Sequence, residues 1–195
     1  MTIIKWKKEY YNMAIDNLKK YVSEAYPTVN QLLRNGMDAS MYTFDSLFKK
    51  IPVTQPLYRL TDNKYIHIKD GIFADKGYLS CTYNFDSVIA HVKGVNIACL
   101  QFDMPKRFEC IDVCALLPEN NNEGEIILPR GLRFKVEKTQ EYSTPSEIQE
   151  FLDNIGSISS AKEICDFYRI GTIHYYKLQL PKQPCIISAL AMPMI

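Results

Sequence analysis

The spacing of apolar residues changes near Pro56, and this change constrains the fold of the 195-residue chain more than any other feature. In residues 8–26, Ala14, Leu18 and Tyr21 recur at three- and four-residue intervals, which is the spacing of one helix face. After Pro56, short segments rich in strand-forming residues alternate with turn residues. Helices first and clustered strands afterwards predict an α+β fold.

Proline and glycine mark the expected ends of the N-terminal helices. Pro27 should end the first helix, and Thr28 should cap a second helix that stops before Gly36. A third helix is expected from a cap at Thr43 to Pro52.

The rest of the chain is expected to be mainly strands, with no linker that divides it. One or two helices are predicted over residues 144–168. We therefore expect a single domain over residues 1–195, with a helical part of about 1–52 and a β-rich core of about 53–195. Eight strands are predicted, at 57–60, 77–82, 96–103, 109–116, 125–129, 132–138, 172–180 and 185–191.

Composition excludes several classes of function. The net charge of +1 gives no general attraction to nucleic acid or to an anionic membrane. The N-terminus lacks the apolar stretch of a secretory signal, and the longest apolar run, CIISALAMPMI, is far shorter than the ~20 residues of a membrane helix. The six cysteines form no CxxC pair and the three histidines are scattered, so we expect reduced thiols and no metal site. These features predict a soluble protein in the cytoplasm where it is made.

Three polar features stand out in the β-rich part. Arg59 lies in an apolar strand, where its charge needs an anionic partner, either a salt bridge or a bound phosphate or carboxylate. Ser80 and Thr82 place two hydroxyls on one side of a strand. Glu123 and Glu125 also point to one side of a strand, and they form either a solvated sheet edge or a pair with a chemical role.

In this order the segments LYR, GYLSCT and EGEIILPRG resemble the mono-ADP-ribosyltransferases of the arginine-serine-glutamate group, which includes bacterial toxins and phage enzymes. The resemblance covers residues 51–138, and the segment HYYKLQL is similar to the closing strand of that family. The sequence departs from the family pattern at Cys81, in the Ser-Thr-Ser element, and at Leu60, where glycine is frequent. Residues 139–170 exceed a minimal family core and have no role assigned by the resemblance.

The resemblance implies two packed β-sheets around a cleft for NAD, which is the substrate. Glu125 is implied to stabilise the cation that forms on the ribose when nicotinamide leaves, with Ser80 holding Glu125 and Arg59 binding the NAD phosphates. Glu123 is implied to hold and activate an acceptor arginine of a target protein. The loop of residues 115–122 would then contact that target.

The same resemblance assigns the rest of the NAD site. Leu60 and Thr82 are expected to border it, and Phe85 or Tyr83 should stack on the nicotinamide. Phe85 could equally be a core residue that anchors the helix of residues 85–92. The protein is expected to be a monomer that acts on a protein, in the cytoplasm where it is made or in that of a host cell. Two alternatives remain open: an enzyme that chiefly hydrolyses NAD, and an inactive member of the family that only binds.

Overall fold

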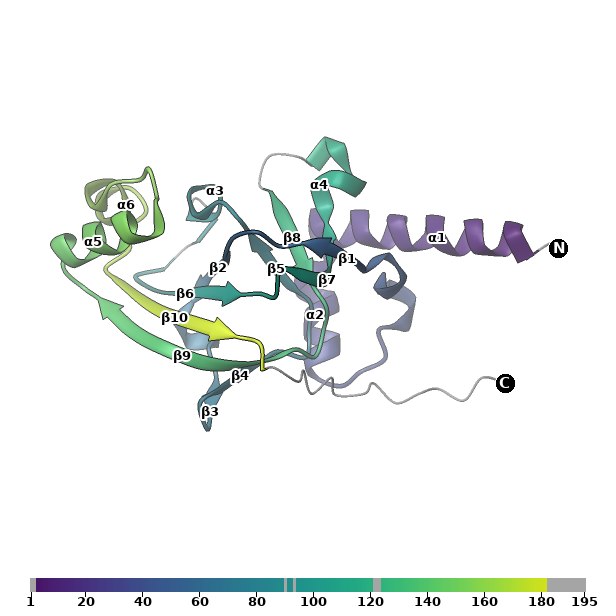
Figure 1. Ribbon diagram of the computed structural model, residues 1–195, viewed down its shortest axis with the longest axis horizontal. Coiled ribbons are helices and arrows are strands. Elements are labelled where there is room, and N and C mark those ends of the chain that lie inside the picture. The colour runs from purple at the N-terminus through teal and green to yellow at the C-terminus, as the bar shows by residue number, and fades with distance from the viewer. Residues whose placement is uncertain (1–2, 90, 93, 121–123, 182–195) are drawn as a thin grey trace.

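The computed structural model describes residues 3–89, 91–92, 94–120 and 124–181. Helices lie at the two ends of the molecule and strands lie between them (Figure 1). Within the described ranges, no helix is both long and apolar enough to cross a membrane.

The N-terminal helices form one nearly continuous run. Helix α1 spans Ile3–Lys20, a π-helical segment spans Tyr21–Ala25, and α2 spans Tyr26–Arg34. The expected break at Pro27 is wrong, because the proline lies in the first turn of α2, where a missing N–H breaks no helical hydrogen bond. The expected Thr28 cap is wrong as well, since Ala25 holds the cap position. Gly36 follows the helix with a φ of 69°, as predicted.

The predicted third helix is also wrong. Two single turns, Ser40–Tyr42 and Asp45–Leu47, are followed by strand β1 at Lys49–Pro52. β1 pairs antiparallel with β7, Arg107–Asp112, in a register that joins Lys50 to Glu109. This pairing between distant segments satisfies the backbone of residues that local spacing would have made helical.

Most of the predicted strands are confirmed. The segment 109–116 is split, because the Asp112 side chain accepts a hydrogen bond from the Ala115 N–H (3.0 Å) and starts the short helix α4, Val113–Leu116. The strand expected at 185–191 lies outside the described residues. Six predicted strands are observed as β2 Leu57–Asp62, β5 Leu79–Thr82, β6 Asn96–Asp103, β8 Glu125–Leu128, β9 Arg133–Tyr142 and β10 Thr172–Gln179.

The prediction missed one hairpin. Strands β3, Ile68–Lys69, and β4, Ile72–Ala74, are joined by Asp70 and Gly71, which both have positive φ values of 52° and 71°. Two consecutive residues of this kind form the tight turn that suits a two-residue hairpin loop.

Helices predicted in the second half are confirmed. α3 spans Phe85–Ile89, α5 spans Pro145–Ile155 and α6 spans Ala161–Asp166. α5 begins with a capping box, in which the Thr144 side chain and the Glu147 side chain bond each other's backbone N–H groups. Single turns at Asn63–Tyr65 and Pro118–Asn120 complete the described elements.

The strand order is β1-β7-β8-β5-β2-β6-β10-β9-β4-β3. It divides into two parts at the junction of β5 and β2, which share only one register pair, Tyr58 with Thr82. All pairs are antiparallel except β10 with β6.

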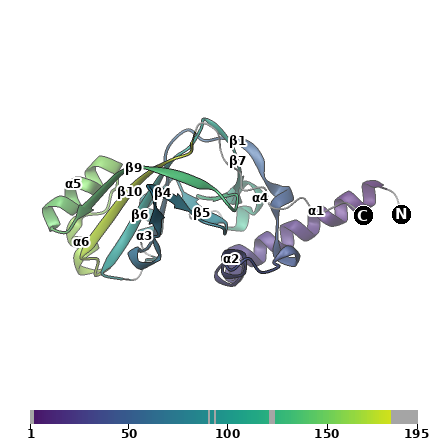
Figure 2. The ribbon, with the colours of Figure 1, turned by 90° about the horizontal axis from the view of Figure 1, so that it is seen from below.

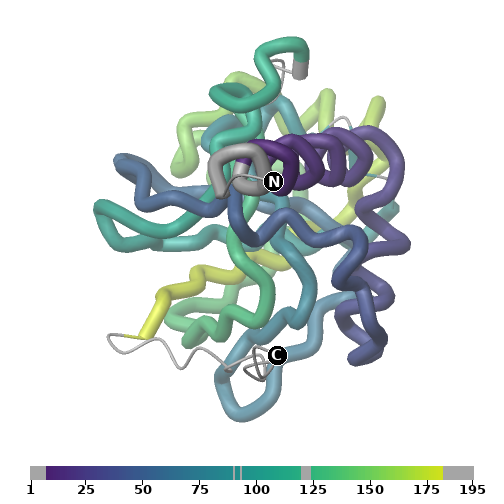
Figure 3. Tube along the Cα trace, turned by 90° about the vertical axis from the view of Figure 1, so that its right-hand side faces the viewer, coloured from purple at the N-terminus to yellow at the C-terminus, as the bar shows by residue number. Residues whose placement is uncertain are grey.

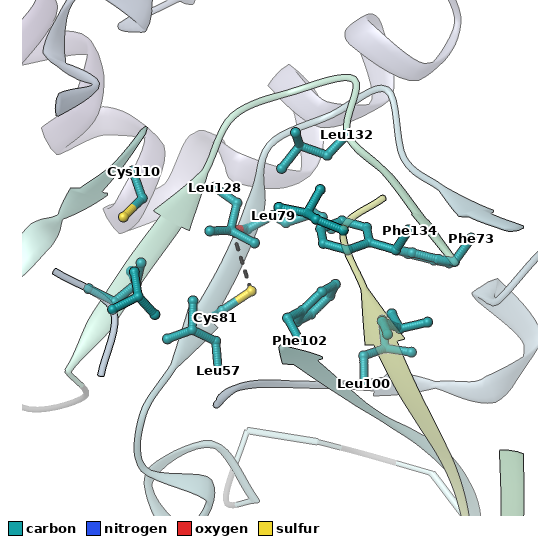
Figure 4. Packing of buried hydrophobic residues seen from close by; sticks show 14 residues of the cluster. Leu57, Phe73, Leu79, Cys81, Leu100, Phe102, Cys110, Leu128, Leu132 and Phe134 are labelled. Atoms are coloured by element: carbon teal, nitrogen blue, oxygen red, sulfur yellow. Dashed lines mark hydrogen bonds between the residues drawn. The ribbon is translucent and has the colours of Figure 1, made fainter. Parts of the chain in front are cut away.

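The two parts of the sheet pack on a common core. Leu79, Cys81 and Leu128 from one part meet Leu57 and Phe102 from the other in one buried cluster (Figure 4), which we call the first cluster. The strands form one sheet, and its two parts face this shared core as packed layers do. The α+β fold class predicted from the sequence is therefore confirmed.

Two further clusters hold the helices. The second cluster packs α3, α5 and α6 on the strands through residues such as Phe85, Phe151 and Ile164. The third cluster packs α1 and α2 through Leu18, Tyr21 and others. α5 and α6 lie at the opposite end of the molecule from α1 and α2 (Figure 2), and Figure 3 shows the N-terminal helices from their own end.

Candidate active site

Three neighbouring strands bring together the arginine, the serine and one glutamate singled out in the sequence. Arg59 lies on β2, Ser80 on β5, and Glu125 begins β8, with β5 between the other two strands. The register pairs Thr82 with Glu125 and Ser80 with Ile127. Ser80 and Glu125 are therefore diagonal neighbours on one face, close enough for side-chain contact.

The Ser80 residue is held by both of the other two. Its hydroxyl donates a hydrogen bond to Glu125 Oε1. Its carbonyl oxygen accepts a hydrogen bond from Arg59 Nη1 at 2.9 Å. All three residues are half-buried, so their polar groups are shielded in part from water but still reachable. The arrangement is a fixed carboxylate beside a fixed cation.

A buried polar contact connects this site to the N-terminal helices. Asn30 of α2, only 2% exposed, accepts a hydrogen bond from the Tyr78 N–H at 2.8 Å through Oδ1. Its Nδ2 donates to the Tyr78 carbonyl (3.2 Å) and to the Tyr21 hydroxyl (2.9 Å). Tyr78 directly precedes β5, so α2 fixes the start of the strand that carries Ser80.

Tyr21 lies near the charges of the site. Burial raises the pKa of its hydroxyl above the ordinary value, while the nearby positive charge of Arg59 lowers it and the negative charge of Glu125 raises it. The Tyr21 ring also packs edge-on against Tyr78, with centroids 5.6 Å apart. Tyr21 falls on the predicted helix face, but no sequence signal connects it with the site.

An ion pair supports the same junction. Arg34 donates to both carboxylate oxygens of Asp75, at 2.9 and 2.7 Å, and the Gly77 N–H donates to Asp75 at 2.8 Å. Burial alone would raise the pKa of Asp75, but the Arg34 and Gly77 bonds and the charge of Arg59 outweigh it and hold the pKa below the usual range. Gly77 itself has no room for a side chain, since a Cβ would lie 2.6 Å from Asn30 Oδ1.

The other residues expected around NAD lie in different environments. Thr82 is buried, and its Oγ1 accepts a hydrogen bond from the Asn84 N–H at 3.0 Å. Leu60 is half-buried against the second cluster. Tyr83 is half-buried against the first cluster, and burial raises the pKa of its hydroxyl.

Phe85 is a core residue. It is 3% exposed, and its ring packs edge-on against Tyr58 and Phe151, with centroid distances of 6.2 and 5.7 Å. This packing favours the alternative that Phe85 anchors its helix.

Glu123 lies outside the described residues, as do Asn121 and Asn122 of the preceding loop. The described residue next to it, Gly124, has a φ of 58° and approaches Thr82, whose Oγ1 would be 3.6 Å from a Cβ at this position. The geometry of the two glutamates relative to each other is therefore not part of the described site.

Two surface cavities are separate from these residues. One of about 300 Å³ lies between the N-terminal helices and Tyr42, and one of about 350 Å³ lies beside the β3–β4 hairpin. Neither is lined by Arg59, Ser80 or Glu125, so hydrogen bonding rather than cavity shape identifies the site. Over the part of the chain that the structure describes, no group of three or more His, Cys, Asp or Glu residues could hold a metal ion.

The fold and the site define a class. Two packed β-layers with an arginine, a serine and a glutamate gathered on adjacent strands match the arrangement that the sequence resemblance implied for ADP-ribosyltransferases. Residues 60–156 match the family model described as ADP-ribosyltransferase exoenzyme. Residues 60–156 are thus similar to a family of NAD-dependent ADP-ribosyltransferases, and the resemblance found in the sequence is confirmed. Arg59 lies one residue before the matched span.

Solved structures of bacterial toxins share the fold. Plx2a, an ADP-ribosyltransferase toxin from Paenibacillus larvae, is 15% identical over 91% of this chain and 94% of its own, with a TM-score of 0.52. C3stau2 from S. aureus, solved with NAD, is 16% identical over 91% of this chain and 94% of its own, with a TM-score of 0.53. Exoenzyme S from Pseudomonas aeruginosa, solved with human 14-3-3 protein beta and carba-NAD, is 14% identical over 94% of this chain and 84% of its own, with a TM-score of 0.53. No curated protein sequence matches the chain.

Proposed function

We propose that the protein is a mono-ADP-ribosyltransferase that transfers ADP-ribose from NAD to an arginine side chain of a target protein and releases nicotinamide. The observation that carries this proposal is the hydrogen bond from Ser80 to Glu125 beside Arg59. It supports the roles that the sequence resemblance implied for these three residues.

Glu125 stabilises the transition state in this proposal. Cleavage of the bond between nicotinamide and ribose leaves positive charge on the ribose, and a carboxylate fixed beside that charge lowers the barrier. The Ser80 hydroxyl restricts the rotation of the carboxylate, so little reorganisation is needed as the charge develops. The half-buried position strengthens the attraction relative to that in water.

Arg59 binds the phosphates of NAD. A guanidinium carries five N–H donors, so Arg59 can hold the Ser80 carbonyl and still reach a phosphate oxygen. The NAD phosphates would also be the anionic partner that the Arg59 charge needs in an apolar strand.

Glu123 selects the acceptor. The pKa of an arginine side chain lies far above neutral pH, so the guanidinium must lose a proton to a nearby base before it can attack. The carboxylate of Glu123 would hold the guanidinium and accept that proton. The proposal for arginine rests on this residue of the sequence, two positions before Glu125.

The partner is a protein that carries the acceptor arginine. The loop of residues 115–122 precedes the site, and its described part contains the end of α4 and the turn Pro118–Asn120. We propose that this loop contacts the target and that the protein acts as a monomer in the cytoplasm of the cell that makes it or of a host cell.

Water is the competing acceptor. If it dominates, the protein is mainly an NAD glycohydrolase with the same Ser80–Glu125 pair. The protein should be incubated with labelled NAD, a cell lysate and a free arginine analogue. Transfer of label that hydroxylamine removes and that Glu125→Gln abolishes supports the proposal, whereas release of nicotinamide without transfer supports hydrolysis. NAD binding without either reaction would leave the binding-only alternative and overturn the enzymatic one.

A further inference from the structure

The loop between α5 and α6 is tied to α3 by a single carboxylate. Asp86 accepts a hydrogen bond from the Ser157 hydroxyl, from the Ile158 N–H at 3.1 Å, and from both the N–H (3.2 Å) and the hydroxyl (2.7 Å) of Ser159. All four donors are neutral groups of three consecutive residues. Such a concentration of bonds on one side chain fixes the loop relative to α3.

The backbone of Asp86 is also linked to the site, through two hydrogen bonds within the turn that follows β5. The Asn84 N–H donates to Thr82 Oγ1 (3.0 Å), and the Asp86 N–H donates to Asn84 Oδ1 (3.0 Å). Thr82 is the register partner of Glu125. The turn that follows the Ser80 strand is therefore connected on one side to the catalytic strands and on the other to the α5–α6 loop.

Apolar packing connects the same two regions. Phe85 contacts Phe151 of α5 on one side and Tyr58, the neighbour of Arg59, on the other. Phe85 is fully enclosed and Ser159 is buried, but Asp86 and Ser157 are only half-buried and Ile158 is exposed, so most of the polar contacts can be changed without opening the core. α3 is thus held to the α5–α6 unit by the apolar packing of Phe85 and, separately, by the hydrogen bonds of Asp86.

We propose that Asp86 is a positioning residue: by tying α3 to the α5–α6 loop, it holds the turn that follows β5, where Thr82 and Tyr83 are proposed to border NAD. This inference rests on the proposed function and gives a role to part of residues 139–170, which have none by the family resemblance. A segment that is ordered in advance loses less conformational entropy when the substrate binds. The tie therefore lowers the KM for NAD and leaves the chemical step to Glu125 and Ser80.

Two sets of substitutions test this from both sides of the contact. Asp86→Asn keeps the size of the side chain but turns an amide NH2 toward groups that are themselves donors. Ser157→Ala with Ser159→Ala removes the two hydroxyl donors and leaves α3 unchanged. Asp153→Asn is the matched control, because Asp153 is an exposed carboxylate of α5 that accepts a hydrogen bond from Gln149.

The measurement is steady-state release of nicotinamide over a range of NAD concentrations, with a thermal melt of each variant. We expect the KM for NAD to rise about five- to tenfold in Asp86→Asn and in the double serine variant, with kcat within twofold of the wild type and the control unchanged. A purely structural role would lower the active fraction and hence the apparent kcat, but would not move the KM. A lower melting temperature with an unchanged KM therefore overturns the inference. If the wild type itself neither binds nor cleaves NAD, the proposed function fails instead.

Discussion

The Ser80 hydroxyl and the Glu125 carboxylate are hydrogen-bonded across strands β5 and β8, although 45 residues separate them in the chain. Their register is diagonal, because Ser80 faces Ile127 and Glu125 faces Thr82. Both backbones are fixed by sheet hydrogen bonds, so the direction of the carboxylate is set by the strands rather than by a loop. Strand pairing therefore prepares the carboxylate for a charge that develops beside it.

Glu125→Gln should remove both NAD cleavage and transfer. The amide keeps the shape of the side chain but carries no charge to stabilise the ribosyl cation, so kcat should fall by about 10²–10³-fold. Nicotinamide release and label transfer should be measured together. Glu150→Gln, which neutralises an exposed glutamate of α5, is the control and should behave as the wild type. Retained cleavage in Glu125→Gln would show that another residue bears the charge.

Ser80→Ala should reduce kcat less than Glu125→Gln, by about 10- to 100-fold, because the carboxylate remains but is free to rotate. The two residues act as a unit, so the double variant should be no worse than Glu125→Gln alone. The rates of all three variants should be compared in one double-mutant cycle. Additive losses would show that Ser80 acts on the substrate and not through Glu125.

The strands that carry the site could be predicted from the sequence because their local pattern agrees with their final environment. Leu79 and Cys81 alternate with Ser80 and Thr82, and the structure places the first pair in the first cluster, as a strand pattern requires. The segment containing Arg59 was predictable for the same reason. The order of the strands in the sheet depends on which strands pair, and no local sequence pattern specifies that.

Other features were not predictable because distant contacts decide them. β1 is a strand because β7 lies beside it, and its own residues favour a helix equally well. The role of Asn30 depends on Tyr78, 48 residues away, and a buried asparagine on a helix has no distinctive sequence signal. Phe85 could be assigned to the core only when Phe151 was found against it.

Glu123→Gln should separate transfer from hydrolysis. The amide can still contact a guanidinium but cannot take its proton, so transfer to the arginine analogue should fall by at least about 100-fold. Cleavage of NAD by water should persist within about tenfold, since Glu125 remains. Both products should be quantified from the same reaction. An equal loss of the two activities would contradict the division of roles between the glutamates.

The Arg34–Asp75 pair should make stability depend on pH in the acid range. The pKa of Asp75 is held below its ordinary value in the folded protein, so its stabilising effect is complete above the unfolded pKa of about 3.9 and is lost as the pH falls through the folded pKa. Asp75→Asn should lower the free energy of unfolding by about 1–3 kcal/mol near pH 7. The difference from the wild type should shrink toward roughly pH 3. Denaturant titrations at several pH values measure this, with Asp166→Asn, a change at an exposed carboxylate, as the control. If the free-energy difference between the wild type and Asp75→Asn is the same at every pH, the pair contributes nothing through charge.

Gly77 and Asn30 should be coupled in stability. In the wild type, Gly77→Ala forces Asn30 to move, because the new Cβ would lie 2.6 Å from its Oδ1 and 2.9 Å from its Cγ. The shift breaks the hydrogen bond to the Tyr78 N–H and should cost about 1–3 kcal/mol of unfolding free energy. In an Asn30→Ala background the two shortest contacts are gone and only the Cβ at 3.2 Å stays close, so the same change should cost less, about 1 kcal/mol or below. Denaturant unfolding of the four proteins measures this coupling, and equal costs in both backgrounds would mean that Asn30 does not hold the start of β5. Because β5 carries Ser80, the Gly77→Ala change should also slow NAD cleavage. The slowing should be larger in the wild-type background than in the Asn30→Ala background.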